Sequence, residues 1–320
     1  VTGRGEPASR WQQPFEAELT GVFAVQSEIA TQVVRELGVA LGAGAERRLL
    51  ERPTRDVAAY DAYLRGEAAS VGFGVTDPAS LRRAVALYEE AVALDPAFAQ
   101  AWARLARACA HLHTNSVPTP AMLDRARSAA ERAMALAPRS AEAHLAQAAY
   151  VGLAYADPSL ELDLLEKARR LAPDDPEVLT AAALVEQSLG RWDDTVAHLK
   201  RAERLDPRSV LTKRRLALAL LLLRRHGEAL ETIELGRKIA PSSLVLVELK
   251  VVAHIALGDV AGARTALDSV PPEVSADRLL AHLAGYQDLG WLFDERRLRT
   301  LLDLTAAAFD GDRGTWGLRL

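Results

Sequence analysis

Apolar residues recur along most of the chain at helical spacing, three and four residues apart, and the resulting stretches end at regularly spaced prolines. Successive prolines of the motif Leu/Ile-x-Pro are separated by 42, 35, 34 and 34 residues, at Pro96, Pro138, Pro173, Pro207 and Pro241. A weaker sixth copy ends at Pro272. Proline lacks the N–H that would continue a helix, so each copy is a stop signal. The pattern predicts an internal repeat of about 34 residues made of short helices.

Small residues recur at two fixed distances from these prolines. The residues five before them are Ala91, Ala133, Ala168, Ala202 and Gly236. The residues ten after them are Ala106, Ala148, Ala183, Ala217 and Val251, small with one exception. A small side chain lets two helix axes approach closely, so these positions predict where the helices cross.

The repeat resembles the tetratricopeptide repeat (TPR), a pair of antiparallel helices with a small residue at their crossing and a proline near the end. Trp102, Leu105, Ala106 and Cys109 occupy the characteristic positions of a first helix. The resemblance covers about residues 80 to 270. It implies an all-α fold, a right-handed α-solenoid of antiparallel helix pairs.

Several positions depart from the family pattern. Glu161 and Thr195 stand where a small residue is typical, and Lys213 stands where an apolar one is typical. The 42-residue copy contains His111–Pro120, which we expect to form a lengthened interhelix loop, because solenoid loops accept insertions without disturbing the stack.

The two ends of the chain differ from its middle. Residues 1–50 lack the repeat and are expected to be a junction from an upstream domain, with a remnant strand and an amphipathic helix. We place the TPR array at 51–272 and degenerate, truncated helical repeats at 273–320. This arrangement resembles the C-terminal region of bacterial multidomain regulators, whose upstream domain is a serine/threonine kinase, a nucleotide cyclase or a winged-helix domain.

Composition and charge restrict the classes of partner and the cellular location that we expect. The 320 residues carry a net charge of −4 and a pI near 6.0, which argues against a nucleic-acid partner. The apolar run Leu216–Leu223 is far shorter than the ~20 residues that span a bilayer, so we expect no membrane insertion. No secretory signal pattern is present, and a cytoplasmic location is favoured, although an upstream domain would carry any such signal.

Candidate chemistry is sparse. The single cysteine, Cys109, excludes an intrachain disulfide and is expected to be buried and inert. His111 and His113 form the only close histidine pair, without a third ligand nearby in the sequence. Asp174-Asp175 and Asp193-Asp194 stand at helix starts, where negative charge complements the helix dipole. We therefore expect no catalytic site, no metal and no cofactor, and any enzymatic activity would lie upstream.

The expected functional surface is the concave side of the solenoid, lined by the first helix of each pair. It would bind a protein or peptide partner, or contact the chain's own N-terminal helix or a second copy. The sequence leaves open an interaction module of a signalling protein, a non-catalytic tail of a kinase or cyclase, and a homo-oligomerisation scaffold. The predicted groove residues are Gln100, Ala103, Arg107, Leu145, Thr180, Leu184, Gln187, Arg214, Leu218, Leu221, Glu248 and Val252.

Overall fold

The computed structural model of the chain describes residues 53–70, 78–116, 118–286 and 289–305. The expected junction at residues 1–50, with its strand and amphipathic helix, lies outside the described residues. So does the end of the chain after residue 305.

The described residues form helices joined by short turns, and no strand occurs among them. The all-α prediction is confirmed for this part of the chain. The helices are α3 (Val57–Ser70), α4 (Pro78–Leu94), α5 (Ala99–Asn115), α6 (Pro120–Leu136), α7 (Ala141–Tyr155), α8 (Pro158–Leu171), α9 (Pro176–Ser188), α10 (Trp192–Leu205), α11 (Val210–Leu222), α12 (His226–Ile239), α13 (Leu244–Ala256), α14 (Val260–Asp268), α15 (Ala276–Tyr286), the 3₁₀ helix η3 (Leu289–Leu292) and α16 (Glu295–Leu302).

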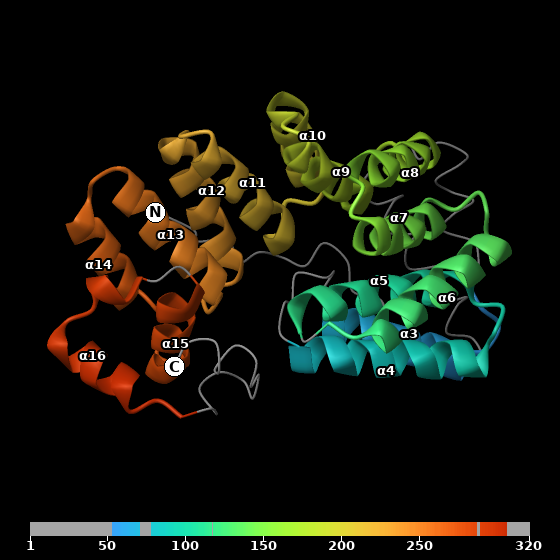
Figure 1. The fold of residues 1–320 in the computed structure, drawn as a ribbon, viewed down its shortest axis with the longest axis horizontal. Coiled ribbons are helices and arrows are strands. Elements are labelled where there is room, and N and C mark those ends of the chain that lie inside the picture. The colour runs from blue at the N-terminus through green and yellow to red at the C-terminus, as the bar shows by residue number, and fades with distance from the viewer. Residues whose placement is uncertain (1–52, 71–77, 117, 287–288, 306–320) are drawn as a thin grey trace, which may run out of the picture.

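The helices pack as successive pairs that follow one another in an arch, from α3 and α4 at the lower right to α15 and α16 at the lower left (Figure 1). The outer helices α8, α10 and α14 cover the inner helices α7, α9 and α13 (Figure 1). Inner helices also contact the inner helices of adjacent pairs, including α5 with α7 and α11 with α13. The first helix of each pair therefore forms the inner face of the arch.

The small residues predicted at the helix crossings are all buried. Ala91, Ala133, Ala168 and Ala202 have no exposed surface, and Gly236 is also buried. A Cβ at Gly236 would lie 3.0 Å from Leu246 Cδ1, so α12 and α13 could not approach as closely with a larger residue there. The second set, from Ala106 to Val251, is at most 1% exposed. The predicted repeat register is confirmed.

The 42-residue copy of the repeat does not contain the lengthened interhelix loop that the sequence predicts. His111–Asn115 continue α5 rather than leaving it, so that α5 and α6 each have 17 residues. The apolar pattern continues through the buried Leu112, and Ser116 Oγ donates a hydrogen bond to the Leu112 carbonyl where α5 ends. Thr119 then caps α6, with Pro120 in its first turn. The additional residues mainly lengthen two helices, because no helix stop occurs before Pro118.

Two departures from the family pattern are accommodated by polar partners. Lys213 is 3% exposed, and its Nζ lies 2.9 Å from Glu203 Oε1. Thr195 is fully buried and donates its hydroxyl to the carbonyls of Arg191 and Ala183. A buried polar group is tolerated when it is hydrogen-bonded, so neither residue disrupts the array.

The turn after α11 contains a strained residue. Gly190 and Gly258, each 17 residues after its repeat proline, adopt φ values of 74°, and Arg224 at the same position has φ 58°. A non-glycine residue in this left-handed region costs ~1–2 kcal/mol of stability. Glycine avoids this cost, but it also makes the unfolded chain more flexible, which offsets part of the gain in the free energy of unfolding.

We therefore expect Arg224→Gly to raise the free energy of unfolding by about 0.5–1 kcal/mol. Urea denaturation followed by circular dichroism measures it. Arg191→Gly is the control, because Arg191 has φ −83° and gains nothing from glycine. Equal effects of the two substitutions would show that the turn at Arg224 is not strained.

Candidate functional site

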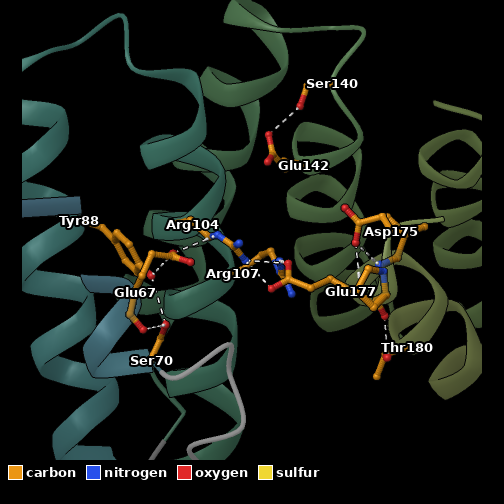
Figure 2. A network of polar contacts seen from close by, with 12 residues as sticks. Glu67, Ser70, Tyr88, Arg104, Arg107, Ser140, Glu142, Asp175, Glu177 and Thr180 are labelled. Atoms are coloured by element: carbon orange, nitrogen blue, oxygen red, sulfur yellow. Dashed lines mark hydrogen bonds and ion pairs between the residues drawn. The ribbon is translucent and has the colours of Figure 1, made fainter. Parts of the chain in front are cut away.

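Four charged residues join helices of three different pairs on the inner face, and we call them the inner ion-pair cluster: Glu67 of α3, Arg104 and Arg107 of α5, and Glu177 of α9. Arg104 Nη1 and Arg107 Nη1 each lie 2.7 Å from Glu177 Oε2. Arg104 Nε lies 3.1 Å from Glu67 Oε1. Figure 2 shows both arginines extending from one helix toward Glu177. The cluster ties α5 to α9 past the intervening pair α7–α8.

Local sequence places Glu177 at this position. Asp175 caps α9 by accepting hydrogen bonds from the backbone N–H groups of Glu177 and Val178, and Pro176 occupies the first turn. A carboxylate in the first turn also complements the helix dipole. Arg104 and Arg107 are three residues apart on α5 and hence share a face.

Burial and charge act in opposite directions on this cluster. Burial raises the pKa of Glu177, but Arg107 and Arg104 together outweigh it and lower that pKa to about 2. Burial likewise lowers the pKa of Arg104, while Glu177 and Glu67 raise it well above its usual value. Glu177 and Arg104 are therefore charged at neutral pH, and the neighbouring helices depend on these charges remaining paired.

A hydrogen-bonded extension connects the cluster to the first helix pair. Tyr88 donates its hydroxyl to Glu67 Oε1 at 2.6 Å, and Ser70 Oγ lies 3.2 Å from the same hydroxyl (Figure 2). The Tyr88 ring packs directly on Gly66, where an added Cβ would lie 2.6 Å from a ring carbon. Polar contacts thus run without interruption from α4 through α3 and α5 to α9.

The twelve predicted groove residues differ widely in accessibility. Leu184 is 41% exposed. Gln100, Gln187, Arg214, Leu218 and Val252 are partly buried. The remaining six are buried, at most 9% exposed: Ala103, Arg107, Leu145, Thr180, Leu221 and Glu248.

The buried members have internal partners. Arg107 belongs to the inner ion-pair cluster, Thr180 Oγ1 lies 3.3 Å from Thr212 Oγ1, and Glu248 Oε2 lies 2.6 Å from His282 Nε2. Their assignment to a partner-binding groove stays a prediction. The residues that a partner can reach concentrate on α9, α11 and α13, where Leu184, Leu218 and Val252 offer apolar surface.

Glu67, Arg104 and Glu177 do not stand out in the sequence as candidate site residues. Arg104 and Glu177 are 73 residues apart, and their pairing omits one repeat. The only available signal was the pair of arginines on one helical face, which also fits a solvated surface. The contact depends on the curvature of the array, which the repeat spacing does not specify.

The other candidate chemical groups have structural roles. Cys109 is fully buried, and burial raises the pKa of its thiol to about 12, as expected for an inert cysteine. His144 Nδ1 lies 2.9 Å from the Ser140 carbonyl, and His254 Nδ1 lies 2.9 Å from Asp259 Oδ2. Over the described ranges, no group of three or more His, Cys, Asp or Glu side chains has an arrangement that fits a metal ion. In the same ranges, no helix has both the length and the apolar character needed to cross a membrane.

Comparison with known proteins identifies the architecture. No family model matches the chain. The chain is similar in structure to the APC/C hetero-tetramer Cut9–Hcn1, with a TM-score of 0.54 and 16% identity, over 88% of this chain and 54% of that one. The fold is a tetratricopeptide-repeat solenoid. Similarity to a thermophilic TPR protein of Thermus thermophilus extends over 62% of this TPR solenoid and 99% of that chain, at 24% identity and a TM-score of 0.49.

One curated protein shares sequence with part of the chain. It is named "Putative adenylate cyclase 3" and comes from Rhizobium meliloti (strain 1021). The two are 33% identical over 95 residues, which is 30% of this chain and only 16% of that protein. The chain therefore covers only about a sixth of the length of that relative.

Proposed function

We propose that the chain is a protein-interaction module that binds an extended segment or helix of a protein partner on the inner face of the TPR solenoid. The observation that carries this proposal is the accessible apolar surface formed by Leu184 on α9, Leu218 on α11 and Val252 on α13. Leu218 and Val252 pack on the core beneath them, so the surface is held in place. Accessible apolar side chains on successive inner helices favour an interface at this face.

The cluster at the other end of the inner face supports the same location. Arg104, Arg107 and Glu177 already satisfy one another across α5 and α9, which leaves little of that region for a partner. The partner's segment would therefore lie mainly along α9, α11 and α13. Its apolar side chains would be buried there, as in other interfaces where a few central residues supply most of the affinity.

We expect Leu184→Asp and Leu218→Asp each to weaken binding of peptides selected from a displayed library against the wild-type chain. The loss should be at least about tenfold, since a charge would be placed in an apolar contact. Fluorescence anisotropy of the labelled peptides measures it. Leu160→Asp is the matched control, because Leu160 is 43% exposed on the outer helix α8.

Peptides that bind all three variants as tightly as the wild type would place the interface elsewhere. A molecular mass that rises with protein concentration in light scattering, lost in Leu218→Asp, would instead favour a homo-oligomerisation scaffold. Circular dichroism spectra equal to the wild type would show that the variants retain their helices.

We further propose that the module is the sensing or regulatory part of a larger bacterial signalling protein, and specifically of a nucleotide cyclase. The partial match to the Rhizobium protein supports the cyclase over a kinase or a winged-helix regulator. The reading frame upstream of Val1 tests it. A cyclase domain encoded there would agree with the proposal, and a kinase or winged-helix domain would contradict it.

A further inference from the structure

Two adjacent arginines of α11, Arg214 and Arg215, differ from the arginines of the inner ion-pair cluster. Both are partly buried. Neither makes an ion pair or a side-chain hydrogen bond within the described part of the chain. The neighbouring Lys213, by contrast, is paired with Glu203. Buried charges in proteins are normally paired, so two adjacent unpaired guanidinium groups require an explanation.

These arginines lie on the inner surface close to α5. Burial and, after it, the positive charges of Arg107, Arg215 and Arg214 together lower the pKa of His111 to about 3. Charges affect a neighbour in this way only over short distances. The arch thus brings α11 near the C-terminal half of α5, although more than 90 residues separate them in sequence.

The charge in this region is incompletely balanced. Arg107 is neutralised by Glu177, and Glu248 lies near Arg214 but also contacts His282. Burial, together with the adjacent Arg215, lowers the pKa of Arg214 to about 10, which keeps the group charged at neutral pH. Burial also lowers the pKa of Arg215, and no carboxylate in the described ranges opposes that effect. About one positive charge therefore remains uncompensated among the described residues.

We propose that Arg214 and Arg215 form an anion-recognition site that receives an acidic side chain from the partner's segment. This inference rests on the proposed function and specifies the chemistry of the partner. Guanidinium groups bind carboxylates through paired, charge-assisted hydrogen bonds. Leu218 follows one turn later on the same helix and would contact an apolar residue of the same segment.

The surroundings favour one isolated carboxylate over a polyanion. Glu248 lies near Arg214 and would repel a densely charged strand. The net charge of the chain is −4, and the basic residues of α11 have no aromatic residue among them on which bases would stack. An acidic residue flanked by apolar residues is thus the pattern that matches both the charge and the adjacent apolar surface.

A pair of labelled decapeptides tests the site. Each has an amidated C-terminus and two leucines flanking a central residue, which is glutamate in one peptide and glutamine in its twin. We expect the full chain to bind the glutamate peptide about tenfold more tightly in anisotropy titrations, since hydrogen bonds to charged groups are the stronger ones. The preference should decrease as NaCl rises from about 50 to about 500 mM.

The variant Arg214→Gln/Arg215→Gln should bind the two peptides equally. The matched control is Arg170→Gln/Arg208→Gln, which removes the same charge from exposed positions and should retain the preference. Because Arg214 and Arg215 have no described ion-pair partner, we expect the double variant to melt no lower than the wild type. Its folded state can then be verified by circular dichroism.

Three results would overturn the inference: equal affinity of the wild type for both peptides, no measurable binding of the glutamate peptide, or a preference retained by the double arginine variant. The proposed function is tested separately by the library-selected peptides. If those peptides bind and lose affinity in Leu218→Asp while the glutamate preference is absent, the interaction surface stands and the acidic-segment inference fails.

Discussion

Glu177→Ala is expected to destabilise the chain by about 3 kcal/mol, because it leaves Arg104 and Arg107 without their shared carboxylate. Breaking a buried ion pair by removing one partner costs ~3–5 kcal/mol, and the lower end applies because 30% of the Glu177 side chain is exposed. Denaturation by urea at pH 7 measures the change. The control Glu131→Ala removes an exposed carboxylate 3.8 Å from Arg127, and should cost less than about 0.5 kcal/mol.

The difference in stability between the wild type and Glu177→Ala should depend on pH, and the pKa of Glu177 determines the direction. The arginines hold the pKa of Glu177 at about 2, below its unfolded value. A carboxyl group with a lowered folded pKa stabilises the protein above its unfolded pKa, and the contribution is lost as pH falls through the folded pKa. The gap between wild type and Glu177→Ala should therefore narrow below about pH 4.5. A gap that is constant with pH, or a loss no larger than that of Glu131→Ala, would contradict an ionic role for Glu177.

Glu161→Gln is expected to stabilise the chain by about 2 kcal/mol at pH 8 and to have little effect at pH 4.5. Glu161 of α8 lies against Gly152 of α7, where an added Cβ would meet its carboxylate. Burial raises the pKa of Glu161 to about 7, and no described residue pairs with its carboxylate. The ionised form is thus disfavoured in the folded state.

At Glu161 the folded chain holds a proton that the unfolded chain has lost between about pH 4.5 and pH 7, so the contribution of this residue to stability should fall as pH rises through this window, and the wild-type curve should drop relative to that of Glu161→Gln. Glutamine does not ionise, and the slope due to this residue disappears in the variant. Urea denaturation at pH 4.5, 6, 7 and 8 measures both curves. The control Glu231→Gln changes an exposed glutamate of α12 and should run parallel to the wild type. Parallel curves for Glu161→Gln as well would show that its carboxyl group is well solvated.

The repeat spacing predicted the fold because helix crossings impose a local requirement. Only a small residue fits at Ala91 or Ala183, and that requirement recurs in each copy, so the sequence alone shows the register. The predicted loop at His111–Pro120 was wrong for a local reason too. Inserted residues with helical preference lengthen a helix until a stop signal occurs, and the prediction placed the stop too early.

The inner surface was less predictable. Positions such as Leu184 and Leu218 follow from the helical period, and the structure leaves them accessible. Whether Arg107 reaches solvent or a carboxylate two repeats away depends on small rotations between successive helix pairs. Those rotations accumulate along the array and leave no signature in the spacing of the prolines. The burial of Arg107 therefore became apparent only with the three-dimensional structure.

The link between α5 and α9 also bears on how the array unfolds. A solenoid in which each repeat contacts only its neighbours behaves as a one-dimensional chain of coupled units that can fray from either end. The contacts of Glu177 with Arg104 and Arg107 add a coupling between non-adjacent repeats. The segment from α5 to α9 is thereby bound into a single cooperative block. Among the described residues, the ion pairs after α10 join only adjacent helix pairs, so we expect those pairs to open more readily from the C-terminal side.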